Sequence, residues 1–415
     1  MAGMKWRWLA ALPVAMLWGA GGSGCQERAN RVQTEAALRQ TVEKMVPGVE
    51  RATGLKFRRH PAVLRRNRSQ VRDYVARKFD EELPPGELAG AQAAYRLFGL
   101  IPDTFDLRRV LVNLLTEQIA GYYDPDSNAL FVPSDIDPFQ LRIVVSHELV
   151  HALQHEYVNL DSLTQQKRQN DRRSAAQAVL EGQATFAQIA VLMPEQRPET
   201  LPPGWFWRQR EVASQQQAQM PEFAQAPPWL RETLIFPYLG GAEFIRWFEH
   251  QYPGKQPYGA LMPTSTEQIL DPTRYAAGDQ PRSLAFQAGG GRGGRDTVVY
   301  EDDLGEFEIQ LLLTQLLGSE ERAATSASGW AGDRYQVLGG RADVLVWYTV
   351  WDDGPAAGRF AEGLRRGWEK RRSGGPADRR FEIARLTVAS RPAVRLVDAP
   401  AGWAGWKNLP QVGLR

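Results

Sequence analysis

The sequence contains very little cysteine. Its 415 residues include a single cysteine, Cys25, so no disulfide can form within the chain. Stability must therefore come from packing or from a bound metal. The formal net charge is only +2, which gives no reason to expect a nucleic acid as a partner. Beyond the first 25 residues, no apolar run is long enough to cross a membrane.

The composition instead favours packed domains. Hydrophobic residues make up 43% of the chain and aromatic residues 10%, and a chain of this length predicts two domains. One local charge imbalance occurs, a group of arginines at positions 58, 59, 65, 66 and 68. We interpret it as a solvated face in preference to an anion-binding patch.

The N-terminus has the pattern of an export signal. A short basic start precedes an apolar run at 8–18 that is too short to span a membrane, and small residues follow up to Cys25. This resembles a bacterial lipoprotein signal, although Gly22 departs from the usual aliphatic residue. The resemblance implies removal of 1–24, export, and a membrane anchor through a lipid on Cys25. Because Gln26 rather than Asp follows, it also implies the outer membrane of a Gram-negative host. A plain secretory signal with an incidental cysteine is the alternative.

The pattern of the remaining chain predicts an α+β protein with two domains. A mainly helical domain with a small hairpin occupies 25–287, the glycine-rich segment 288–296 is a linker, and a smaller α+β domain occupies 297–415. Within the first domain, Pro47-Gly48 is expected to end the first helix. The Pro-, Gln- and Trp-rich stretch 194–230 is expected to be an irregular surface segment or a lid.

Histidine is concentrated in one place. Three of the five histidines lie in HELVHALQHE, residues 147–156. His147 and His151 are four residues apart, so on a helix both imidazoles point to one side and can bind one ion. Glu148 is displaced around the helix and can reach a water on that ion without being a ligand. The motif therefore predicts a zinc site with Glu148 as the general base.

A hydrolytic zinc site needs a third protein ligand. His155 stands one further turn along, roughly 6 Å beyond His151, and a straight helix cannot wrap three turns around one ion. We therefore assign His155 a structural or supporting role. Glu181, on the next strong helix, is the better ligand, because a carboxylate from an adjacent antiparallel helix completes a His-His-Glu set. Gly182 is expected to let that helix approach the first. An ordinary surface glutamate is the alternative.

Several segments together resemble a known group of proteins. HELVHALQ followed by EGQAT is similar to the gluzincin branch of zinc metallopeptidases. With LFGLIPDTFDLRRVL, AGYYDPDSNALFV, IFPYLGGAEF and STEQIL, they resemble a set of poorly characterised bacterial zincin-like proteins over about residues 95–275. The resemblance implies a zincin-like metallopeptidase domain with Zn²⁺ and a peptide or protein substrate. It also implies an acidic residue at the position that His155 occupies and another near Gln183. This chain departs from the pattern at both places.

Residues 121–134 are predicted to form a β-hairpin around the turn 124–128. By the resemblance, its second strand corresponds to the zincin strand that lies at the rim of the cleft and pairs with an extended substrate. We therefore predict that Ala129, Leu130 and Phe131 bind substrate through their main chain. An ordinary core hairpin is the alternative.

The favoured function is a membrane-anchored zinc peptidase of the cell envelope. Zinc lowers the pKa of a bound water and polarises the scissile carbonyl, and Glu148 carries the water proton to the leaving amine. Tyr238 and His250 are the candidate donors to the developing oxyanion. One alternative is a catalytically inactive zincin-like lipoprotein that binds an envelope partner, with a structural zinc. Another is an envelope lipoprotein without metal.

The C-terminal unit contains no histidine and no cysteine, so it offers zinc no nitrogen or sulfur ligand. Its strand ADVLVWYTVW is apolar on both faces, which predicts that its own helices cover one face and the first domain the other. The four tryptophans are expected in the core: Trp330, Trp347, Trp351 and Trp368. We expect a docked domain that shapes or partly roofs the cleft, and a freely tethered module is the alternative.

Overall fold

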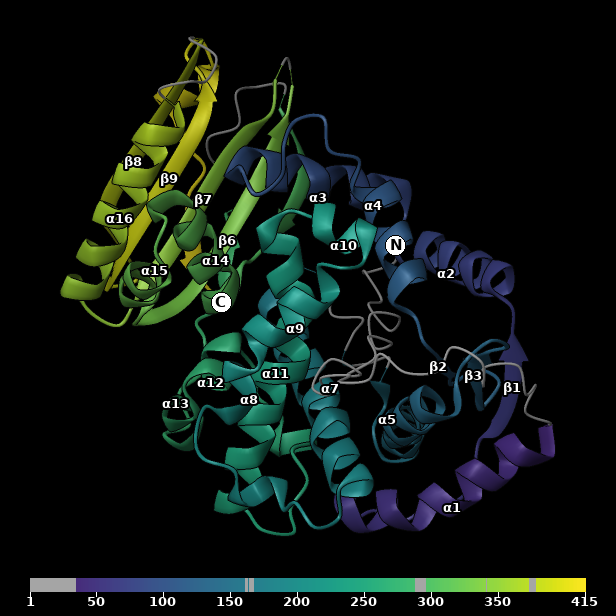
Figure 1. Ribbon diagram of the computed structural model, residues 1–415. Helices are drawn as coiled ribbons and strands as arrows, with labels where there is room; N and C mark the ends of the chain where they lie inside the picture. The colour runs from purple at the N-terminus through teal and green to yellow at the C-terminus, as the bar shows by residue number, and fades with distance from the viewer. Residues whose placement is uncertain (1–34, 161–162, 164–167, 288–295, 341, 373–377) are drawn as a thin grey trace.

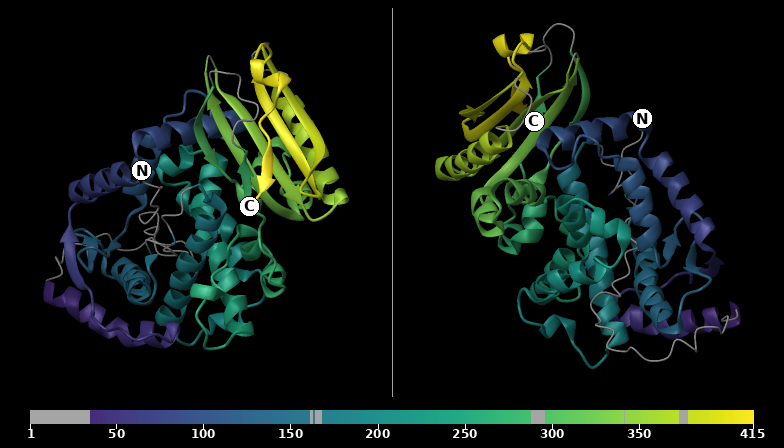
Figure 2. Two further views of the ribbon diagram at one scale, coloured as in Figure 1. Left: turned by 180° about the vertical axis from the view of Figure 1, so that it is seen from behind. Right: turned by 45° about the horizontal axis from the view of Figure 1, so that its top comes forward.

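The computed structural model describes residues 35–160, 163, 168–287, 296–340, 342–372 and 378–415 (Figure 1). The predicted signal, Cys25 and all of the predicted linker except Asp296 lie outside the described residues. The described chain is α+β, as expected, with a mainly helical part and a five-stranded sheet (Figures 1 and 2). Among the described helices, none combines the length and the apolar character needed to cross a membrane.

The helical part contains one small sheet. Its elements are, in chain order, α1 (Glu35–Thr53), β1 (Ala62–Arg66), α2 (Arg68–Glu82), α3 (Pro85–Phe98), α4 (Leu107–Gln118), β2 (Tyr122–Asp124), β3 (Ala129–Pro133), α5 (Pro138–Tyr157), α7 (Asn170–Leu192), η3 (Pro198–Thr200), α8 (Trp205–Arg208), α9 (Arg210–Gln217), α10 (Pro221–Gln225), α11 (Pro228–Gln251), η4 (Gly259–Leu261), α12 (Thr266–Leu270) and α13 (Pro272–Ala276).

The histidine helix α5 starts at a well-formed cap. The Asp137 side chain accepts the backbone N–H groups of Phe139 and Gln140, and Pro138 occupies the first turn, where its missing N–H costs nothing. The helix then packs against α1 and α7 and, through its apolar residues, against the small sheet. These contacts bury its central residues from Leu141 to Gln154, apart from Arg142.

Glycine lets α7 and α11 cross in backbone contact. A Cβ on Gly182 would lie 2.1 Å from the carbonyl carbon of Gly241, and a Cβ on Gly241 would lie 1.9 Å from the Ala178 carbonyl oxygen. The prediction that Gly182 serves the approach to the histidine helix is therefore wrong. Gly182 faces α11, and the residues that face α5 are on another side of α7.

Gly241→Ala is expected to lower the free energy of unfolding by at least about 3 kcal/mol, because the added methyl must push two backbones apart. Urea unfolding followed by circular dichroism measures the change. Gly86→Ala is the matched control, since Gly86 is also helical and a Cβ there meets nothing within 4 Å. Its stability should be unchanged or slightly raised. Equal losses in both variants would contradict the crossing as the cause.

Two expectations about the helices are corrected. Helix α1 does not end at Pro47 but continues to Thr53, because Val49 and Thr53 are buried against the neighbouring core and that burial offsets the disruption by proline. The stretch 194–230 is not an irregular segment. It forms short helices held by two fully buried side chains, Phe206 and Phe223.

The C-terminal unit is built on an antiparallel sheet with the order β5-β6-β7-β9-β8. Its elements are β4 (Leu284–Phe286), β5 (Thr297–Asp302), α14 (Gly305–Leu317), α15 (Glu320–Ala327), β6 (Trp330–Gly339), β7 (Val344–Trp351), α16 (Gly354–Arg372), β8 (Arg379–Val388), β9 (Arg391–Pro400), η5 (Ala404–Lys407) and β10 (Val412–Leu414). Strand β4 pairs with β10. Residues Leu284–Phe286 therefore belong to this unit, although they precede the predicted linker.

Both faces of β7 are buried, as predicted, but they are covered differently. One face, with Trp347 and Trp351, packs against α14, α16 and Phe98 of α3 in one continuous core. The other face packs against β4, β10 and the C-terminal segment, not against the first domain. All four tryptophans expected in the core are at most 2% exposed.

The C-terminal unit also caps the start of α7. The backbone N–H groups of Asn170 and Asp171 donate to Asp302 and Asp303, at 3.0 and 2.8 Å, while the N-cap residue Gln169 supplies no side-chain bond. The unit is therefore docked. It contacts the N-terminal end of α7, however, about 15 Å by helix rise from Glu181. The expectation that it roofs the cleft finds no support in these contacts.

Candidate metal centre

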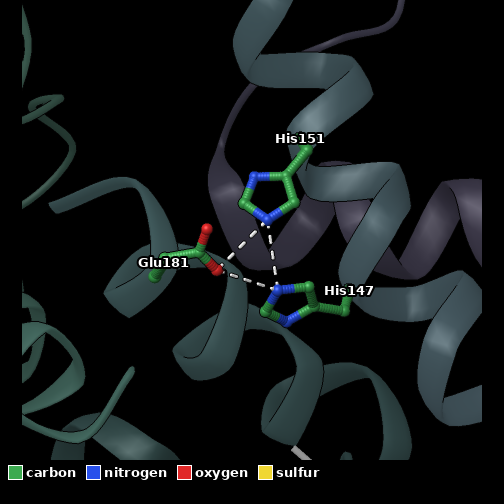
Figure 3. Close-up of side chains that lie close together, drawn as sticks. All are labelled: His147, His151 and Glu181. Carbon is green, nitrogen blue, oxygen red and sulfur yellow. Dashed lines mark hydrogen bonds and ion pairs between the residues drawn. The ribbon is translucent and has the colours of Figure 1, made fainter. Parts of the chain in front are cut away.

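Three side chains from two helices meet in the interior (Figure 3). His147 and His151 project from one side of α5, with their Nε2 atoms 3.1 Å apart, and Glu181 projects from α7. Oε2 of Glu181 lies 3.2 Å from His147 Nε2 and 3.4 Å from His151 Nε2. These three residues could hold a metal ion. The sequence-based preference for Glu181 over His155 agrees with this placement.

The spacing suits a small tetrahedral ion. Bonds of roughly 2.0–2.1 Å to tetrahedral zinc separate any two ligand atoms by about 3.4 Å, close to the separations within the cluster. Two imidazoles and one carboxylate are also a donor set typical of zinc hydrolases. All three side chains are buried, and Glu181 is only 1% exposed. The residues therefore fit a zinc ion, although the same set can bind other divalent metals.

Electrostatics within the cluster explain why three polar groups tolerate burial. Burial acts to raise the pKa of Glu181, but the imidazoles outweigh it and lower that pKa to about 2. Burial acts against the charged form of His151, yet the Glu181 carboxylate raises its pKa to about 9. Burial lowers the pKa of His147. The attraction between the Glu181 carboxylate and the His151 imidazole thus favours the charged form of each, and a metal cation could take the place of the imidazole proton.

Gln154 holds His151 in position. Its Oε1 lies 2.8 Å from His151 Nδ1, so the imidazole can donate there and present Nε2 to the cluster. The Gln154 amide nitrogen donates to the Leu180 carbonyl and to Gln183, both at 3.0 Å, which links the histidine helix to α7 beside Glu181. Sequence reasoning missed Gln154. Its position three residues after His151 was the available signal.

Replacing Gln154 by alanine should weaken zinc binding about 10–100-fold, because His151 loses the partner that orients its ring. Competition with a chromogenic zinc chelator measures the affinity, and circular dichroism checks the fold. Gln140→Ala, an exposed glutamine on the same helix, is the control and should leave the affinity unchanged. Equal affinity in both variants would show that His151 needs no orienting partner.

Glu148 lies beside the cluster without joining it. Its side chain is 4% exposed, and Oε2 accepts the backbone N–H of Tyr123 in β2 at 2.8 Å. Burial raises the pKa of Glu148 to about 8. The main chain therefore fixes the carboxyl, and burial raises its affinity for a proton, which places its pKa near neutral pH, where acid–base catalysis is most effective.

Of the other candidate residues, Tyr238 contacts the His-His-Glu cluster, whereas His155 and His250 lie outside it. The Tyr238 ring stacks on His147, with ring centroids 5.9 Å apart and planes at 27°. His147 Nδ1 has no hydrogen-bond partner among the described residues, so the Tyr238 ring adds to the contacts that His147 makes through Nε2. His155 is exposed and its Nδ1 lies 3.0 Å from the Tyr123 hydroxyl. His250 is exposed about 18 Å further along α11 than Tyr238, outside the cluster.

The predicted substrate strand is corrected. The hairpin forms as expected, but β1 pairs in parallel with β3, so the small sheet has the order β1-β3-β2. Ala129, Leu130 and Phe131 are therefore buried in the central strand, with main chains bonded on both sides, and cannot receive a peptide there. Sequence periodicity could not reveal the distant partner strand β1. The edge strand that faces Glu148 is β2.

A second acidic group, Glu267, Asp279 and Asp352, also has converging carboxylates. The guanidinium of Arg274 lies among them, bonded to Asp279 at 2.8 Å and to Asp352 at 2.7 Å. Because that cation already occupies the space between the carboxylates, we assign no metal to this group.

Comparison with known proteins identifies only the C-terminal unit. Residues 296–405 match the family described as Domain of unknown function (DUF8575), from β5 into η5. No curated protein and no solved structure matches the chain. The match lies outside the His-His-Glu cluster and therefore gives no information about its chemistry.

Proposed function

We propose that this protein is a zinc-dependent peptidase of the gluzincin type. The observation that carries the proposal is the buried convergence of His147, His151 and Glu181 beside the fixed carboxylate of Glu148. The three converging residues would hold Zn²⁺, which supplies Lewis acidity toward a water molecule and a peptide carbonyl when bound. The substrate class is a peptide or protein.

We assign proton transfer, orientation of the metal ligands and stabilisation of the oxyanion to residues of the chain. Oε2 of Glu148 is held by Tyr123, which leaves Oε1 to take a proton from the attacking water and return it to the leaving amine. Gln154 orients His151, and Tyr238 holds the ring of His147. We assign the Tyr238 hydroxyl the role of donor to the developing oxyanion.

The proposal is tested on the purified mature chain. We expect near-stoichiometric zinc and hydrolysis of an unstructured protein such as casein. Chelation should abolish the hydrolysis, and added zinc should restore it. Bound zinc without hydrolysis would favour a catalytically inactive protein with a structural metal, a function consistent with the burial of all four site residues. Absence of metal would contradict both.

The location follows from the N-terminal resemblance. We propose an exported protein of the bacterial envelope that is anchored in the outer membrane of a Gram-negative host through a lipid on Cys25. In Cys25→Ser, a high-salt wash should move the protein from the membrane pellet to the soluble fraction, because the lipid anchor is lost. Fractionation followed by immunoblotting measures this. A Cys25→Ser protein that resists extraction at high salt would contradict lipidation.

A further inference from the structure

The most basic part of the chain is a short continuous segment. From Arg51 to Arg72 the sequence contains eight Lys and Arg residues and no Asp or Glu, although the net charge of the whole chain is only +2. We call residues 51–72 the basic edge. It comprises the end of α1, the loop to β1, β1 itself and the start of α2. The proposed peptidase chemistry uses none of these residues.

The basic edge lies at the periphery of the molecule. Among the described strands, β1 pairs only with β3, so it is an outer strand, and Figure 1 places it at the boundary between α1 and α2. Six of the eight cations are exposed: Arg51, Lys56, Arg58, Arg59, Arg68 and Arg72. The fold therefore turns this sequence run into an accessible cationic surface.

Exposed apolar side chains accompany the cations. Leu64 in β1 is 42% exposed, Tyr157 at the end of α5 is 40% exposed, and Phe139 at the start of α5 is 60% exposed. Arg58 lies over the Tyr157 ring, 4.7 Å from its centroid. Phe139 follows closely on Ser134, which exchanges hydrogen bonds with the β1 end of the edge. A surface with both properties is typical of peripheral membrane binding.

Acidic residues near the edge neutralise only part of its charge. Glu50 pairs with Lys56 at 2.8 Å, and Asp135 lies 3.8 Å from the Arg68 guanidinium. Glu156 accepts the backbone N–H groups of Arg58 and Arg59. With Asp73, exposed beside Arg72, four carboxylates stand against the eight cations, which leaves an excess of positive charge along the edge.

The position of the edge in the chain points to a bilayer. Nine residues lie between Cys25 and Glu35, where α1 starts, a span of at most about 35 Å, and α1 packs against β1. We propose that the basic edge docks onto an anionic lipid bilayer, with its cations on the headgroups and Leu64, Phe139 and Tyr157 at the interface. The proposal builds on the proposed lipid at Cys25, which would hold the edge within reach of the membrane.

Vesicle binding without the lipid anchor tests this surface separately. The mature chain with Cys25→Ser should sediment with phosphatidylethanolamine–phosphatidylglycerol vesicles, not with phosphatidylcholine vesicles, and high salt should release it. Replacing Arg58, Arg59, Arg68 and Arg72 by glutamine should lower partitioning about fivefold for each cation, which is about 600-fold in total. Phe139→Ser should lower it several-fold.

The control removes four exposed cations elsewhere: Arg359, Arg365, Arg366 and Lys370 of α16 to glutamine. It makes the same change in net charge and should leave vesicle binding nearly unchanged. Equal losses in the control, no binding to anionic vesicles, or tighter binding to duplex DNA than to vesicles would overturn the proposal. Zinc content and casein hydrolysis of the edge variant should match the parent, so failure here is distinct from failure of the peptidase assignment.

Discussion

Glu148→Gln is expected to reduce hydrolysis of casein by 10²–10⁴-fold while the protein keeps its zinc. Glutamine has the shape of glutamate and can still accept the Tyr123 N–H group, but its amide cannot take a proton from water. The metal ligands His147, His151 and Glu181 are untouched. Initial rates of release of acid-soluble peptides, with zinc content measured on the same samples, give both quantities.

A matched substitution on the surface controls for the loss of one carboxylate. Glu362→Gln on α16 removes an exposed glutamate and should hydrolyse casein at the parental rate. If Glu148→Gln keeps both zinc and activity, Glu148 is not the general base. If it loses zinc, Glu148 supports the metal directly and the proposed division of roles is wrong.

Removing Glu181 is expected to have the second large effect. Both Glu181→Ala and the isosteric Glu181→Gln should lower zinc affinity by more than the roughly 10–100-fold typical of an outer partner, because a direct ligand is lost. His155→Ala should keep the metal, since His155 is exposed and contacts Tyr123 instead of the cluster. Zinc competition measured on all three variants decides between the two residues.

The glutamine variant guards against a folding defect. Glu181 is buried, so alanine leaves a cavity and removes the carboxylate beside His147 and His151, whereas glutamine preserves volume. Zinc should raise the thermal midpoint of the parent and of His155→Ala, but not that of the Glu181 variants. If His155→Ala loses zinc and the Glu181 variants retain it, the gluzincin assignment is wrong.

The C-terminal unit contributes to the site indirectly. Asp302 and Asp303 accept the first N–H groups of α7, the helix that carries Glu181. One hydrophobic core also runs from α3 and α11 into the sheet, so the two parts share their packing. The C-terminal unit thus supports the helix that bears the Glu181 carboxylate.

Local patterns were enough to predict the helix with the two histidines, the hairpin that precedes it, and the strand ADVLVWYTVW of the C-terminal unit, which is β7. A four-residue spacing puts His147 and His151 on one side of any regular helix, and alternation with turn residues defines a hairpin without reference to distant contacts. The choice of Glu181 over His155 also followed from local geometry, because helix rise alone separates successive turns.

Tertiary structure alone decided the features that depend on distant partners. Pairing with β1 made β3 a central strand. Gly182 packs against α11 and not against α5. Helix α1 continues past Pro47 because Val49 is buried. The amide of Gln154 became the partner of His151 only because the side chain is buried between two helices. Sequence periodicity reports which face of an element is apolar, but which element covers that face depends on packing between residues far apart in the chain.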